Sequence, residues 1–158
     1  MYFLAPTELR AIDAGAGLVV AAGAGEVRGL AAAALLSADY AVLDVHATLH
    51  IDAPKTWEAV TRRLGRKALG LHIDQRTTLT AKDAKSEGLC DELIEGDARE
   101  WLDRWMQGRS ELALDSAAML IRSRGGDALE RAEFARLFAI GEPQRGLRAF
   151  LGRRSNFV

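Results

Sequence analysis

The stretch of sequence that decides the fold is LTAKDAKSEGLCDELI, residues 79–94. Thr80 is a residue type that caps helices, and the helix formers after it predict a helix over Ala81–Glu87. Gly88 predicts the end of that helix, because glycine readily takes the left-handed conformation found at helix C-termini. The apolar segment Leu89–Ile94 then predicts a short strand that enters the core.

An α/β unit is predicted upstream of this stretch. Leu18–Ala22 and Tyr40–Asp44 are short apolar runs typical of buried strands. Between them, Gly23–Gly29 predicts a turn, and the Ala- and Leu-rich segment Leu30–Ser37 predicts a helix. The simplest arrangement is a parallel pair of strands joined by a crossover helix. Thr48–Ile51 is a candidate third strand.

Helical patterns dominate the rest of the chain. Pro54 suits a first helical turn, and apolar residues recur at helical spacing up to Gly65. We therefore predict an α/β core over residues 1–95 and a helical C-terminal part over residues 96–158 of the same domain. The helices predicted in that second part are Ala98–Met106, Glu111–Arg124, Leu129–Ile140 and Gln144–Arg153.

Composition excludes several classes of function. The chain has 158 residues, 49% hydrophobic and 27% charged, with a formal net charge of −1, as in one globular domain. Without a basic run, nucleic-acid binding is not expected. No apolar run approaches the roughly 20 residues of a membrane span, and the N-terminus lacks signal-peptide features. No zinc-type cluster is present, and the single Cys90, expected in the core, fits a cytoplasmic protein.

Three segments resemble one known family. LTAKDAKSEGLCDELI is similar to a late motif of the crotonase (enoyl-CoA hydratase/isomerase) superfamily. FARLFAIGEPQRGLRAFLGRRSNF, residues 134–157, is similar to the C-terminal motif of that family. GLAAAALLSADYAVLDVHATL, residues 29–49, resembles its glycine turn, helix and strand. The three occur in the family order and together cover most of the chain.

The resemblance implies a shortened crotonase-like spiral of ββα units, followed by helices. Crotonases bind acyl thioesters and hold the thioester oxygen on two backbone N–H groups as an enolate forms. By resemblance, one such donor maps to Gly29 and Leu30. Arg154, Phe150 and Phe157 match a region that contacts coenzyme A near a subunit contact, although the two aromatics could equally serve packing. No cofactor or metal is implied beyond an acyl-CoA or acyl-carrier thioester as ligand, and family members form trimers or hexamers.

The sequence departs from the family at its catalytic carboxylates. The two glutamates that move protons in the family fall on Ala33 and Ala53, and the N-terminal segment is shorter than in typical members. Asp52, one residue before Ala53, is the nearest replacement base; alternatively it ends a strand or caps the helix that begins at Pro54.

Two histidines are further candidates for proton transfer. His46 and His50 are four residues apart, so on a strand they would share one face. Histidine titrates near neutral pH, which suits general acid–base chemistry, and a structural or surface role is the alternative.

Three functions fit this pattern. The first is an enoyl-CoA hydratase/isomerase-type enzyme that acts on an acyl thioester. The second is a catalytically silent subunit that binds a full-length homologue or another partner chain. The third is a piece of a longer enzyme. Because the strand at Leu18–Ala22 would lack earlier neighbours and expose an edge, we expect an oligomer in either of the first two cases.

Overall fold

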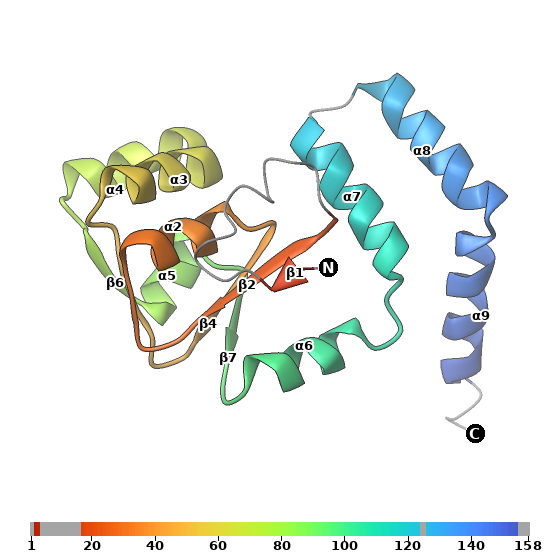
Figure 1. The fold of residues 1–158 in the computed structure, drawn as a ribbon, viewed down its shortest axis with the longest axis horizontal. Coiled ribbons are helices and arrows are strands. Elements are labelled where there is room, and N and C mark those ends of the chain that lie inside the picture. The colour runs from red at the N-terminus through yellow and green to blue at the C-terminus, as the bar shows by residue number, and fades with distance from the viewer. Residues whose placement is uncertain (1, 4–16, 124–125, 155–158) are drawn as a thin grey trace.

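The structure is a computed structural model that describes residues 2–3, 17–123 and 126–154. Its main sheet is parallel, with strand order β1 (Tyr2–Phe3), β2 (Val19–Gly23), β4 (Tyr40–Asp44) and β7 (Glu92–Ile94). The predicted parallel pairing of the two apolar strands is confirmed, with Val20 opposite Tyr40 and Gly23 opposite Leu43. The strand predicted after Gly88 is also confirmed and pairs with β4 (Figure 1).

The main sheet is buried on both faces, which explains why its strands are continuous apolar runs. Val19, Ala21 and Leu43 pack into the larger cluster of buried residues. Val20 and Val42, which alternate with them, pack into a second cluster that includes Leu102 and Ala118 from the C-terminal helices. The sheet therefore separates two cores, one on each side.

A second, three-stranded sheet has the order β3 (Glu26–Val27), β5 (Thr48–His50) and β6 (Thr78–Thr80). The central strand β5 pairs parallel with β3 and antiparallel with β6. Val27, Leu49 and Leu79 form one row across this sheet, and each is almost completely buried. The period of two in a strand places the residues on either side of this row on the opposite face.

Helices α3 (Pro54–Leu64) and α5 (Ala81–Glu87) begin where the sequence predicts, and α2 (Gly29–Ser37) begins one residue earlier than predicted. Helix α2 has buried residues Ala32–Leu36 because it lies inside the larger core. Helix α5 is capped by Thr80, whose Oγ1 accepts from the backbone N–H of Asp83 at 3.2 Å. The same helix ends at Gly88 with a φ of 84°. Helix α3 is followed by a short 3-10 turn (Gly65–Lys67) and by α4 (Ala68–Ile73).

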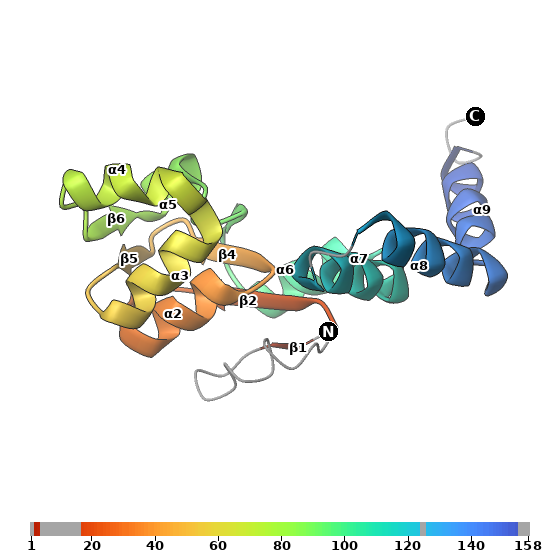
Figure 2. The same cartoon turned by 90° about the horizontal axis from the view of Figure 1, so that it is seen from above.

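After β7 the described chain is helical. The four helices are α6 (Ala98–Met106), α7 (Glu111–Ser123), α8 (Asp127–Ala139) and α9 (Glu142–Arg154). Trp101 and Trp105 of α6 pack against Tyr40, with the Trp105 and Tyr40 rings 5.1 Å apart. Helices α8 and α9 extend away from the sheets (Figure 2), and α8 has no buried residue.

The structure corrects two expectations, one about an exposed strand edge and one about a helix cap. The strand over residues 18–22 is not an edge strand, because β1 pairs with Val19 and Val20 on the side away from β4. Asp52 does not cap α3; the N-cap is Ala53, and buried Thr56 donates to the Ala53 carbonyl at 2.6 Å. Among the described helices, none has both the length and the apolar character needed to cross a membrane.

Candidate functional site

A row of polar side chains lies on the outer face of the three-stranded sheet. In the register of this sheet, Glu26 is opposite Thr48, and His50 is opposite Thr78. These residues alternate with the buried row of Val27, Leu49 and Leu79, so the period of two directs them away from the core. The sheet thereby brings together residues that are more than 20 positions apart in the sequence.

His50 and Glu26 form the closest polar pair of this row. Nε2 of His50 and Oε2 of Glu26 are 2.5 Å apart, and only 16% of the His50 side chain is exposed. Because a carboxylate only accepts, the imidazole Nε2–H donates to Glu26. In the neutral ring Nδ1 then carries the lone pair, and it lies 3.3 Å from the Thr78 hydroxyl. A carboxylate that orients a histidine in this way leaves the second ring nitrogen able to accept a proton.

Arg28 adds positive charge beside this pair. Its Nη2 donates to Oε2 of Glu26 at 3.1 Å and lies 3.3 Å from Nε2 of His50. The hydrogen bond from His50, and next that from Arg28, lower the pKa of Glu26. Glu26 is therefore ionised at neutral pH and remains an acceptor for the histidine.

The first turn of α2 begins directly after Arg28. Arg28 is the N-cap residue and makes no capping bond with its side chain, and the first turn holds no acidic residue. The first helical bond runs from the N–H of Ala32 to the Arg28 carbonyl, so the N–H groups of Gly29 and Leu30 have no partner within the helix. Gly29 has a φ of 56°, and Leu30 is 52% exposed. The oxyanion role that the resemblance implies for Gly29 and Leu30 stays a prediction, and helix N-termini of this kind bind anions.

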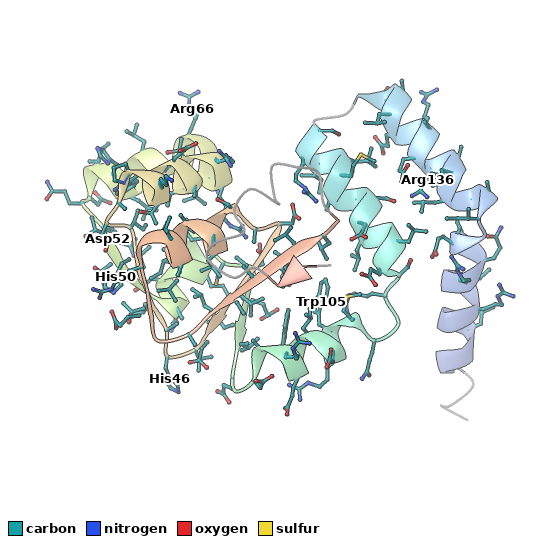
Figure 3. The ribbon with its side chains drawn as sticks, viewed as in Figure 1. His46, His50, Asp52, Arg66, Trp105 and Arg136 are labelled. Atoms are coloured by element: carbon teal, nitrogen blue, oxygen red, sulfur yellow. The ribbon has the colours of Figure 1, made fainter. Side chains whose placement is uncertain are left out.

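The family glutamate positions carry no acid–base group here. Ala33 is buried inside α2 at 3% exposure, and Ala53 caps α3. Asp52 is exposed and lies two residues after His50, at the same end of the α/β part (Figure 3). Its role as a base stays a prediction.

The expectation that His46 and His50 share a strand face is wrong. His46 lies exposed in the turn between β4 and β5, where its backbone N–H donates to Oδ1 of Asp44 at 2.8 Å. That turn separates the two histidines, so only His50 belongs to the row on the sheet. Glu26 was missed from sequence because its link to His50 depends on the pairing of β3 with β5, and β3 has only two residues.

The remaining predicted ligand contacts lie at the C-terminus. Phe150 and Arg154 are within helix α9, and Phe157 lies outside the described residues. In the part of the chain that the structure describes, no three His, Cys, Asp or Glu side chains are grouped to hold a metal ion.

Solved structures of enoyl-CoA hydratases share this arrangement of strands and helices. An enoyl-CoA hydratase from Polaromonas sp. JS666 is 23% identical, with a TM-score of 0.68 over 86% of this chain and 60% of the other. An enoyl-CoA hydratase/isomerase from Cupriavidus metallidurans CH34 is 24% identical, with a TM-score of 0.69 over 93% and 63%. The chain has the crotonase fold.

The crotonase fold is present here in a shortened form, because the chain spans about 60% of the length of those structures. A protein from Thermobifida fusca YX in complex with acetoacetyl-CoA matches with a TM-score of 0.60 and 17% identity, over 76% of this chain and 54% of the other. No protein-family model and no curated protein matches the sequence. The likeness to crotonases is therefore a likeness of fold.

Proposed function

We propose that this chain binds an acyl thioester and transfers a proton at the carbon next to the thioester carbonyl. The observation that carries this proposal is the 2.5 Å contact between His50 and Glu26, directly before the uncapped start of α2. Enolate formation requires a base and an oxyanion site. Arg28, the residue before α2, lies 3.3 Å from Nε2 of His50. The acetoacetyl-CoA held by the Thermobifida fusca structure supports a thioester as ligand.

In the proposed reaction, Nδ1 of His50 accepts the proton of the α-carbon. The electron pair of the broken C–H bond moves onto the thioester oxygen, which becomes an enolate oxygen. The N–H groups of Gly29 and Leu30 stabilise that oxygen, aided by the positive end of the helix dipole. Glu26 is a positioning residue, because it fixes the ring orientation and stabilises the imidazolium that forms.

The test is thioester binding together with hydrogen exchange. Acetyl-CoA and acetoacetyl-CoA are titrated against the chain by calorimetry, and deuterium incorporation at the α-carbon is followed by mass spectrometry. Loss of a general base typically costs about 100-fold or more in rate, so His50→Ala should slow exchange by at least about 100-fold with little change in binding. Glu26→Gln should slow exchange by a smaller factor.

His46→Ala is the matched control, because His46 is exposed in a turn and makes no side-chain contact among those found in the described residues. Asp52→Ala tests the other predicted base. Exchange that is lost in Asp52→Ala but kept in His50→Ala would transfer the role to Asp52. Thioester binding without exchange in the unmodified chain would contradict the proposed proton transfer.

A second candidate function is favoured by the apolar surface of the C-terminal helices. Six large hydrophobic residues of this region are at least 40% exposed: Leu129, Phe134, Phe138, Ile140, Leu147 and Leu151. Apolar patches of this kind mark protein interaction sites. A catalytically silent subunit that docks on a homologue through α8 and α9 would cover them.

Native mass spectrometry distinguishes these candidates. A stable oligomer or a complex with a full-length crotonase, dissociated by Phe138→Ser, supports the subunit function if no thioester exchange accompanies it. A monomer that catalyses exchange argues against it.

A further inference from the structure

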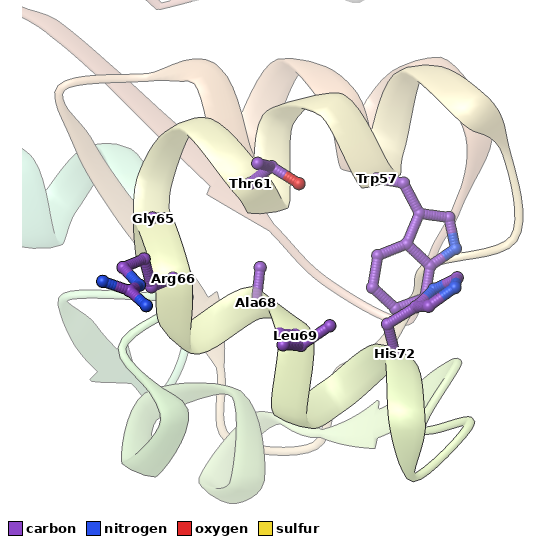
Figure 4. Close-up of a pocket in the computed structure, with 7 residues that line it drawn as sticks. All are labelled: Trp57, Thr61, Gly65, Arg66, Ala68, Leu69 and His72. Carbon is purple, nitrogen blue, oxygen red and sulfur yellow. The ribbon is translucent and has the colours of Figure 1, made fainter.

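Helices α3 and α4 form a hairpin with a groove between them, on elements that contribute nothing to the His50 row. The groove has a volume of about 420 Å³. That volume is within the range of small-molecule sites. Its walls come from both helices and the connecting turn, as Figure 4 shows: Trp57, Thr61, Gly65, Arg66, Ala68, Leu69 and His72.

The walls of the groove are mainly apolar and aromatic. Leu69 is 62% exposed and lines the groove together with Trp57 (Figure 4). The rings of Trp57 and His72 meet edge to face, with centroids 5.0 Å apart and an interplanar angle of 87°. This contact lies at one end of the groove and holds the indole in place. An apolar body inserted there would cover Leu69 and the indole, which stabilises binding through the hydrophobic effect.

The other end of the groove is basic. Arg66 lies in the turn where the two helices join, and Lys67 follows it; both are exposed. The neighbouring Arg62 is paired with Glu58 at 3.0 Å, and Arg63 is paired with Asp91. Arg66 has no such carboxylate partner among the described residues, and none of the seven lining residues is acidic. The charge at this end is therefore complementary to an anion.

We propose that this groove binds a small amphipathic carboxylate, with its apolar body against Trp57 and Leu69 and its carboxylate on Arg66. A free acid of six to eight carbons, such as hexanoate or phenylacetate, carries both features. The proposal needs no thioester chemistry and is independent of the His50 site. It assigns the groove to a small molecule because the volume and the aromatic pair at one end suit a compact ligand.

The experiment is a titration of the ¹⁵N-labelled chain with hexanoate and phenylacetate, and with the neutral hexanamide and phenylacetamide. The indole N–H of Trp57, assigned from the Trp57→Phe spectrum, and the amides of residues 65–72 should shift and saturate. Because an exposed ion pair contributes up to about 1 kcal/mol, the acids should bind about fivefold more tightly than the amides. Arg66→Gln should remove that difference, and Leu69→Asn should weaken all four ligands.

Arg104→Gln is the control for a general change in surface charge, since Arg104 is exposed on α6. It should leave the affinities unchanged. Equal affinity for acid and amide, an unchanged acid affinity in Arg66→Gln, or the absence of saturable shifts over residues 57–72 would each overturn the proposal.

Discussion

Asp39 connects three parts of the fold, and replacing it gives a quantitative test of that connection. Its Oδ2 accepts from the backbone N–H of Val19 at 2.8 Å, at the start of β2. Its Oδ1 lies 3.2 Å from Nε of Arg122 on α7. The side chains of Asp39 and Arg122 are only 15% and 19% exposed. Asp39, at the corner between α2 and β4, therefore has a structural role.

The cost of Asp39→Ala follows from these contacts. Val19 is completely buried, and a buried N–H left without an acceptor costs about 1–3 kcal/mol. Loss of the partly buried ion pair with Arg122 adds about 1 kcal/mol, so the free energy of unfolding should fall by about 2–4 kcal/mol. Asp39→Asn keeps an acceptor for Val19 and loses only the charge, so its cost should be about 1 kcal/mol.

Urea unfolding followed by circular dichroism measures both variants, with the m-value expected to stay constant. Asp103→Ala, at an exposed position of α6, is the matched control and should change stability by less than about 0.5 kcal/mol. A cost for Asp39→Ala as small as that of the control would refute the reasoning. Equal costs for the Ala and Asn variants would show that the charge, and not the acceptor, dominates.

Three more predictions concern the core and the titrating groups. Burial raises the pKa of the Cys90 thiol from 9.0 to about 11, so alkylation at pH 8 should be about 100-fold slower in the folded chain than in urea. The hydrogen bonds from Arg136 lower the pKa of Glu133 from 4.5 to about 2. The stabilising effect of Glu133 should therefore be present above pH 4.5 and disappear as the pH falls towards about 2, as a comparison of urea midpoints with Glu133→Gln would show. Leu49→Ala should cost about 2–5 kcal/mol in urea unfolding because Leu49 is completely buried, whereas Leu69→Ala, at 62% exposure, should cost less than about 0.5 kcal/mol.

Local signals in the sequence were sufficient for most elements of the fold. The Thr80 cap and the Gly88 stop act within a few residues, so the helix between them was predicted with its observed ends. The helix over Ala98–Met106 was likewise predicted with its observed ends, because its apolar face repeats at helical spacing. The parallel order of β2 and β4 followed from the crossover helix between them.

The candidate site was less predictable because it depends on pairing between distant strands. His50 was selected for its chemistry, but its partner Glu26 lies 24 residues earlier on a strand of two residues. Such a strand is too short for a period of two to be visible. The shared face expected for His46 and His50 relied on their spacing of four alone, although His46 lies between the strands Tyr40–Asp44 and Thr48–His50. The edge expected at β2 was wrong for a similar reason, since β1 also has only two residues.

The hydrogen bonds between the start of β2 and α7 have a consequence for synthesis on the ribosome. The N–H of Leu18 donates to Oδ1 of Asp115, 97 residues later, and the Gly17 carbonyl accepts from Arg122, 105 residues later. Translation adds about 5–20 residues per second, so Asp115 and Arg122 are synthesised roughly 5–20 s after the start of β2. During that interval the start of the central strand has no acceptor from α7. A nascent chain would therefore pass through a stage in which this end of the sheet is accessible to chaperones, and slowing translation before α7 should prolong it.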